Sequence, residues 1–144
     1  MRKVKFRGKP VDLIDFDALP EWHKWTKDGW VYGYLIGKDI IVGEVVDFDE
    51  EWFTPEFWCR VDPATVGQFT GLHDGRRGQG QEIYPGDIMK EEDRGFIYIC
   101  KWNRHRCEFA WFLKDGSYIG SIGDMRIGLK VIGNIHDNPE LMRP

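Results

Sequence analysis

Side chains that could do chemistry gather in one polar, glycine-rich stretch near the middle of the chain. Thr70, Asp74 and Asp87 supply a hydroxyl and two carboxylates there, which are groups that acid–base catalysis uses. The same groups also hydrogen-bond to the backbone in turns, and a carboxylate beside a Pro-Gly turn commonly does so. We favour this structural interpretation and predict that the three residues hold the loop rather than catalyse a reaction.

A nucleophile or a metal site would require cysteine or histidine side chains in a suitable arrangement. The sequence has neither a C-x-x-C nor an H-x-x-x-H pair, which a structural zinc site normally needs. Cys100 and Cys107 flank a predicted hairpin turn, and we interpret them as small hydrophobic residues on its ladder. His105 and Cys107 could share a strand face, but a hairpin tip is normally solvated. We therefore expect no catalytic residue, no metal and no cofactor, and predict that the protein is not an enzyme.

Basic side chains offer a different chemistry, the binding of an anion or a nucleic acid. The polar loop carries Arg76 and Arg77, and a predicted turn carries Arg104 and Arg106 close to Trp102. Arginines and an aromatic ring on one face can bind a single strand by charge and stacking. The loop has no GxxxxGK[ST] motif, and the net charge of −4 opposes a phosphate backbone. These five residues are our candidate binding residues, with nucleic acid as the less favoured partner.

Length and composition limit the kind of protein in which such sites could lie. The chain of 144 residues fits one domain, or two small subdomains that share a core. Its three cysteines lack framework spacing, which favours a reducing compartment. We find no signal peptide and no apolar run near the ~20 residues of a membrane span. We expect a soluble, cytoplasmic protein without a membrane partner.

Charge is distributed unevenly along the chain. Residues 39–66 contain one basic residue and eight acidic ones, whereas residues 1–38 contain eight basic and five acidic ones. A run of like charge is usually a solvated face, which is the interpretation that we favour. The alternative is a contact between the acidic middle and the weakly basic start of another copy. This possible contact between copies and the 15% aromatic content lead us to predict self-association into a closed homo-oligomer.

Turn signals and alternating apolar residues indicate a mainly β chain. The strongest turn is Tyr84–Asp87, where proline presets φ and glycine supplies the positive φ of a type II turn. The segments Trp30–Ile36 and Ile40–Val46 predict a β-hairpin. Pro20 is expected to begin a short helix in an irregular insert over 12–27. Further strands are predicted at 4–7, 57–61, 66–70, 87–90, 96–102, 107–113 and 129–135, with a loop or edge over 120–126 and one helical turn near 137–140.

The predicted strands of the C-terminal half leave edges that must be paired or closed. A small, partly closed SH3-like barrel solves this problem, and we predict one within residues 67–144. Residues 1–66 are predicted to form an N-terminal β subdomain with the irregular or short helical insert. Its hairpin should pack on the barrel, because an isolated hairpin is marginal in water. The predicted core of the barrel consists of Ile88, Phe96, Tyr98, Cys100, Trp102, Phe109, Trp111, Val131 and Ile135.

Several blocks of the sequence match those of a known family, in the family's order. The blocks are Val4–Lys9, Gly29–Ile36, Val66–Asp74, Glu82–Ile88 and Val131–Leu141. Together they resemble the YopX family of phage and prophage proteins over almost the whole chain. The insert over 12–27 and the loop over 75–81 are longer than the usual pattern, and the loop is more basic. The resemblance implies a phage-borne, mostly β protein and implies neither an enzymatic activity nor an established molecular role.

Two functions remain as hypotheses. The favoured one is a non-catalytic protein-binding or adaptor module that engages a host or phage protein. Aromatic residues left at exposed edges would suit protein contacts, and we name Trp22, Trp52 and Phe53 as candidates. The alternative is an accessory nucleic-acid-binding protein in phage DNA metabolism, acting through the five candidate binding residues.

Overall fold

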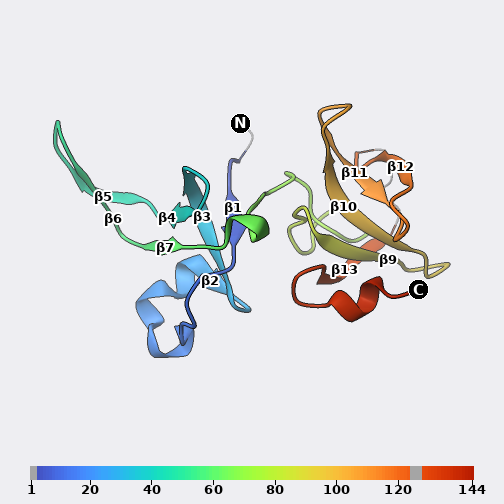
Figure 1. Cartoon of the computed structure of the whole chain (residues 1–144), viewed down its shortest axis with the longest axis horizontal. Coiled ribbons are helices and arrows are strands. Elements are labelled where there is room, and N and C mark those ends of the chain that lie inside the picture. Colours follow the sequence, from blue (N-terminus) through green and yellow to red (C-terminus); the bar gives the residue numbers. More distant parts are fainter. Residues whose placement is uncertain (1–2, 124–127) are drawn as a thin grey trace. The chain divides into compact units, whose positions relative to one another are not determined.

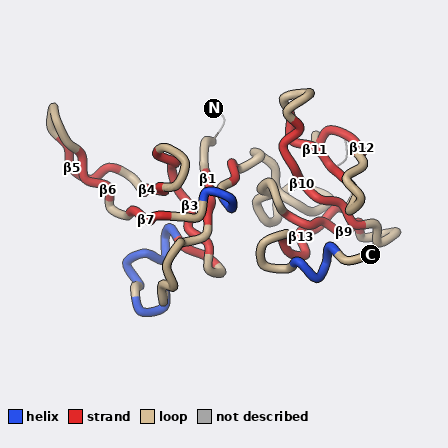
Figure 2. The backbone as a smooth tube through the Cα atoms, in the orientation of Figure 1, coloured by secondary structure: helices blue, strands red, loops and turns tan. Residues whose placement is uncertain are grey.

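Antiparallel strands dominate the chain, as Figure 1 and Figure 2 show. The computed structural model describes residues 3–123 and 128–144, of which 42% lie in strands and 12% in helices. The described strands form three antiparallel sheets. The chain divides into unit 1, Lys3–Gln68, and unit 2, Phe69–Pro144. The predicted mainly β fold class is therefore confirmed.

Unit 1 contains a six-stranded sheet and a separate two-stranded sheet. The larger sheet has the order β7-β4-β3-β1-β8, with β2 paired to β3. Its strands are β1 (Phe6–Gly8), β2 (Thr26–Lys27), β3 (Trp30–Ile36), β4 (Ile40–Val42), β7 (Trp58–Arg60) and β8 (Gly67–Gln68). The smaller sheet consists of β5 (Val45–Phe48) and β6 (Phe53–Pro55). Three short 3-10 helices complete the unit, η1 (Phe16–Ala18), η2 (Pro20–Trp25) and η3 (Pro63–Thr65).

The core of unit 1 lies on one side of the β3–β4–β7 ladder. Its buried residues are Val31, Ile41, Phe57, Cys59 and Val61. The predicted hairpin thus buries Val31 and Ile41 within its own unit, while its packing on the other unit stays a prediction. The hairpin also ends sooner than predicted, because the chain leaves β4 at Gly43 and starts the separate β5–β6 sheet.

Unit 2 is a five-stranded antiparallel sheet with the order β12-β11-β10-β9-β13. Its elements are β9 (Asp87–Glu91), β10 (Ile97–Asn103), β11 (Glu108–Phe112), β12 (Tyr118–Ser121), β13 (Leu129–Asn134) and the 3-10 helix η4 (Pro139–Met142). The predicted type II turn before β9 is confirmed. Asp87 N donates to Tyr84 O at 3.1 Å, and Gly86 has a φ of 93°. The strand β9 begins directly after this turn and lies between β10 and β13, with which it pairs.

The predicted SH3-like barrel is not confirmed. Among the described residues the sheet of unit 2 is open, with β12 and β13 as its two edges, and none of the three sheets closes. The predicted edge over 120–126 corresponds in part to β12, while residues 124–127 lie outside the described residues. Because β9 pairs with both β10 and β13, the central strand has no open edge even though the sheet is not closed.

The core of unit 2 agrees with the sequence prediction only in part. The buried cluster is Ile83, Met89, Tyr98, Cys100, Trp111, Ile122 and Leu129. Ile88 is also buried, and Phe109, Val131 and Ile135 are partly buried. Phe96 and Trp102, however, are 49% and 52% exposed. Backbone hydrogen bonds to β10 from the β9 side run from Glu91 N–Phe96 O to Gly86 N–Cys100 O, so Trp102 lies beyond the last of them.

Candidate functional site

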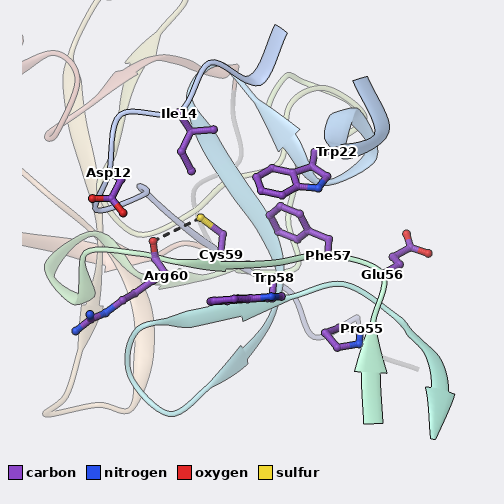
Figure 3. A pocket seen from close by; sticks show the side chains of 9 residues that line it. All are labelled: Asp12, Ile14, Trp22, Pro55, Glu56, Phe57, Trp58, Cys59 and Arg60. Carbon is purple, nitrogen blue, oxygen red and sulfur yellow. Dashed lines mark hydrogen bonds between the residues drawn. The ribbon is translucent and has the colours of Figure 1, made fainter. Parts of the chain in front are cut away.

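A pocket of about 460 Å³ lies along β7 at the edge of the larger sheet of unit 1, and Figure 3 shows it from close by. Its lining combines residues from both faces of the strand, since Phe57 and Cys59 are buried while Trp58 and Arg60 are exposed. The pocket therefore follows the edge of the strand rather than one face. The full lining is Asp12, Ile14, Trp22, Pro55, Glu56, Phe57, Trp58, Cys59 and Arg60.

The irregular insert positions the ring of Trp22 over the pocket. Asp15 caps η1 by accepting a 3.1 Å hydrogen bond from Asp17 N. Pro20 then begins η2, as predicted, where its missing N–H needs no partner. The helix places Trp22 edge-on against Phe57, with ring centroids 5.0 Å apart and an angle of 84°. The 3-10 helix η2 of the insert thus supplies one aromatic wall (Figure 3).

Trp25 also packs on Phe57. Its ring is stacked on Phe57, with centroids 6.4 Å apart and an angle of 9°. Its indole N–H donates to Glu56 Oε1 at 2.6 Å, and Lys24 Nζ lies 3.6 Å from the same oxygen. The ring fits because position 43 is glycine, since a Cβ there would lie 2.7 Å from the indole. Gly43 therefore lets the Trp25 ring approach the backbone closely. It is also the residue at which the chain leaves β4.

The edge of β7 presents backbone groups as well as rings. Gly43 N donates to Phe57 O and Val61 N donates to Asp39 O, both at 2.8 Å. Because backbone polar groups alternate direction along a strand, those of Trp58, one residue after Phe57, point away from β4. On that side Val11 N donates to Arg60 O at 3.1 Å, and among residues 3–123 and 128–144 no named strand pairs with β7 beside Trp58. The Trp58 ring itself is 60% exposed.

Two ionisable groups of the pocket, Cys59 and Arg60, are held by burial, a hydrogen bond and an ion pair. Burial, with the nearby negative charge of Asp12 as the smaller cause, raises the pKa of the Cys59 thiol. The thiol also donates to Arg60 O at 3.5 Å. Arg60 in turn pairs with Asp39 at 3.2 Å. A thiol held protonated is a poor nucleophile.

The polar loop of unit 2 is held by its own carboxylates. Asp74 accepts hydrogen bonds from Gln81 N at 2.6 Å and from Val131 N at 2.9 Å. Asp87 accepts from Tyr84 N at 2.8 Å, and the Thr70 hydroxyl donates to Ile83 O at 2.8 Å. Each of the three residues thus has backbone partners, as the loop-holding interpretation requires.

The five candidate binding residues do not form one surface. Arg76 extends from its loop to Glu92 (3.1 Å) and Asp93 (2.7 Å), just before β10. These carboxylates, first through the Glu92 hydrogen bond and then through the Asp93 charge, raise the pKa of Arg76. Arg77 is exposed in the same loop. A strand rises ~3.3 Å per residue, so β10, of seven residues, separates this loop from the other three by roughly 20 Å.

The other three candidates lie together on the β10–β11 hairpin. Trp102 meets Phe109 edge-on, with centroids 5.0 Å apart. Arg106 pairs with Glu108 at 3.2 Å, and Arg104 is exposed in the turn. The structure therefore brings Trp102, Arg104 and Arg106 together and leaves Arg76 and Arg77 apart.

Thiols and imidazoles also stay dispersed. Cys59 and Cys100 are buried, whereas Cys107 is exposed in the hairpin turn with a φ of 50°. In the part of the chain that the structure describes, no three His, Cys, Asp or Glu residues are placed to hold a metal ion. No helix of the described residues is long and apolar enough to span a membrane.

Sequence reasoning named only one residue of the β7 pocket, Trp22, as an exposed aromatic. It missed Phe57 and Trp58, which it assigned to an ordinary strand. A signal was available in the density of aromatic residues at 52–58, where four of seven are Trp or Phe. Such a run exceeds what one face of one strand can bury.

Comparisons with known proteins agree with the resemblance seen in the sequence. A family model described as YopX protein matches residues 26–143. A solved structure, the crystal structure of protein EF1440 from Enterococcus faecalis, is similar with a TM-score of 0.52 and 22% identity, covering 99% of this chain and 100% of that one. That likeness supports the fold alone. No curated protein matches. Because the family model covers most of the chain, this protein belongs to the YopX family.

Proposed function

We propose that the protein is a non-catalytic protein-binding module, and that the β7 pocket receives an extended apolar segment of a partner protein. The observation that carries the proposal is a pocket of about 460 Å³ with aromatic walls beside Trp58, whose backbone groups point away from β4 at the edge of the sheet. The phage or prophage origin that the family resemblance implies belongs to the same proposal, with a host or phage protein as the partner.

The strand edge explains why the partner is a polypeptide. An extended segment can add to β7 through the outward N–H and C=O of Trp58, which gives affinity independent of sequence. Alternate side chains of that segment then enter the pocket beside Trp22 and Phe57, which gives specificity. A small molecule would use the rings but would leave the backbone groups to water.

The groups around the pocket support a binding role over a catalytic one. Cys59 is kept protonated by burial, and no histidine lines the pocket. Glu56 is already engaged by Trp25 and Lys24. A general base or nucleophile would need a free partner within hydrogen-bond reach.

The test is selection from a random library of displayed peptides, followed by fluorescence polarisation with the selected peptides. We expect binders with one large apolar residue and dissociation constants of about 1–100 μM, since one short strand addition supplies a modest surface. Trp58→Ala should weaken binding at least about tenfold, as expected for a central aromatic contact. Tyr34→Ala is the matched control, because Tyr34 is an exposed aromatic of unit 1 outside the pocket lining.

Two results would count against the proposal. One is a library that yields no binder to the folded protein. The other is a set of binders whose affinity is unchanged by Trp58→Ala and by Phe57→Leu, which would place the peptide elsewhere.

Nucleic-acid binding is the second candidate function, and the cluster of Trp102, Arg104 and Arg106 favours it. The net charge of −4 and the carboxylates that neutralise Arg76 oppose it. Titration with single- and double-stranded DNA at two salt concentrations distinguishes the two functions. We expect weak binding. Micromolar affinity with a steep salt dependence, lost in Arg104→Ala with Arg106→Ala, would support nucleic-acid binding instead.

A further inference from the structure

Within the described part of unit 1, the β5–β6 hairpin packs on little besides itself. We call residues 44–56 the arm, and Figure 1 labels its two strands. Every residue of both strands except Pro55 is exposed, and the strands pair only with each other among the described strands. The exposed apolar side chains are Val45, Val46, Phe48, Trp52 and Phe53, with exposed fractions from 49% to 75%.

The arm gains little stability from contacts with the rest of unit 1. A lone two-stranded hairpin is marginal at best, and its two open edges can accept another strand. The arm is also strongly acidic, with six Asp or Glu and no Lys or Arg in residues 44–56. Its chemistry therefore fits a surface that is cationic, aromatic and has an open strand edge. Two arms would repel each other.

One surface of this chain has all three properties. We call residues 101–109, at the end of the β10–β11 hairpin, the tip. It contains Lys101, Arg104 and Arg106 against one acidic residue, Glu108. Trp102 is 52% exposed within it.

The tip also has the open edge. Glu91 N donates to Phe96 O and Gly86 N donates to Cys100 O, so every second residue of β10 turns its backbone groups toward the β9 side. The next residue in that series is Trp102. The strand β9 pairs with β10 only as far as Ile99. The backbone of Trp102 therefore faces a position that no described strand occupies.

The basic start of the chain, which the sequence suggested as the complement of the acidic middle, fits less well. Arg7 is buried, with its guanidinium 4.2 Å from the centre of the Trp30 ring. Lys9 lies over the same ring at 5.3 Å, and Lys5 lies over Tyr32 at 5.3 Å. Lys101 and Arg106 of the tip also lie over rings, at 5.9 and 5.8 Å. The tip fits better because Arg7 is buried and because the backbone of Trp102 offers an open strand edge.

We propose that the arm of one copy docks on the tip of a second copy. The arm adds a strand beside Trp102, its carboxylates meet Lys101, Arg104 and Arg106, and its rings cover the exposed indole. Every copy of the protein carries both an arm and a tip, so a second copy always offers the complementary surface. Self-association thus follows from two defined surfaces, and it does not depend on what the β7 pocket binds.

Reciprocal charge reversal tests this contact directly. The arm-basic variant carries Asp47→Lys, Asp49→Lys and Glu50→Lys; the tip-acidic variant carries Lys101→Glu, Arg104→Glu and Arg106→Glu. We expect each variant alone to associate at least about tenfold more weakly than the original chain, by sedimentation equilibrium at micromolar concentration in low salt. An equimolar mixture should associate again, because each basic hairpin then meets an acidic one.

A third variant controls for general charge effects. Lys3→Glu, Lys27→Glu and Lys38→Glu reverse three exposed lysines outside both hairpins, and association should persist. Circular dichroism confirms that each variant is folded. A monomeric original chain at every salt concentration overturns the proposal, as does a mixture of folded arm-basic and tip-acidic variants that stays monomeric. Equal loss of association in the lysine control also overturns it.

Discussion

Two irregular segments of this protein are fixed in place by different physical means. In unit 1 the insert over 12–27 is held by rings, with Trp22 and Trp25 packed on Phe57. In unit 2 the loop over 70–83 is held by hydrogen bonds, several of them to Asp74. The two segments differ in the volume of the cavity that remains beside each of them. The hollow beside the rings measures about 460 Å³, and the one lined by Asp74 about 10 Å³.

Ring packing is non-directional, so an irregular segment can be stable without filling the surface around it. A carboxylate that accepts several backbone N–H groups fixes distances and angles and draws the loop closed. The comparison explains why a pocket remains open in unit 1. It also explains why the most polar loop of the chain, in unit 2, is a structural element.

Phe57→Ala should have the largest effect, because both tryptophans of the insert lose the ring on which they pack. We expect a loss of about 3–5 kcal/mol in unfolding free energy, as for other buried phenylalanines. Hydrogen exchange read by mass spectrometry should show faster exchange in peptides from 12–27. Slowly exchanging, unchanged peptides in that segment would show that rings do not hold the insert.

Asp74→Ala should have the next largest effect, and it should appear in unit 2. Two N–H donors, of Gln81 and Val131, lose their acceptor, and we expect a loss of about 2–4 kcal/mol, since bonds to charged groups are the stronger ones. Asp74→Asn keeps one acceptor oxygen and serves as the graded control. If the two variants are equally stable, the one oxygen that Asn keeps contributes nothing, and the whole loss comes from the charge and the second oxygen.

Gly43→Ala should have an intermediate effect confined to unit 1. The added Cβ would lie 2.7 Å from the Trp25 indole, so the ring must move, at a cost of about 1–3 kcal/mol for such overpacking. The matched control is Gly37→Ser, at a turn where a Cβ would meet no atom within 4 Å but the φ of 64° disfavours it. Near-ultraviolet circular dichroism should change for Gly43→Ala and not for the control.

Asp39→Ala should have the smallest effect on the unfolding free energy, because it removes only an exposed ion pair. Asp39 pairs with the exposed Arg60 at the pocket rim, and exposed pairs contribute about 0–1 kcal/mol. Chemical denaturation should find a stability close to that of the original chain. A loss as large as that of Asp74→Ala would remove the distinction between surface pairs and backbone-directed carboxylates.

Local patterns in the sequence predicted local structure well. Proline at the start of η2, the Pro-Gly turn before β9, and the strand Trp30–Ile36 follow from φ preferences and alternation alone. Burial was harder to predict, since it depends on which strand lies alongside. Trp102 looked like a core residue by alternation, yet β9 ends before reaching it. The pocket was harder still, because it joins residues 12 and 60, which no local rule connects.

The exposed thiol in the tip has a practical consequence. Cys107 is exposed, while Cys59 and Cys100 are buried, so a maleimide dye or a nitroxide attaches at one defined position without further engineering. Because the label sits in the turn of the tip, its emission anisotropy or its electron-spin line shape responds to anything that covers this hairpin. The natural sequence thus contains its own spectroscopic reporter for the tip.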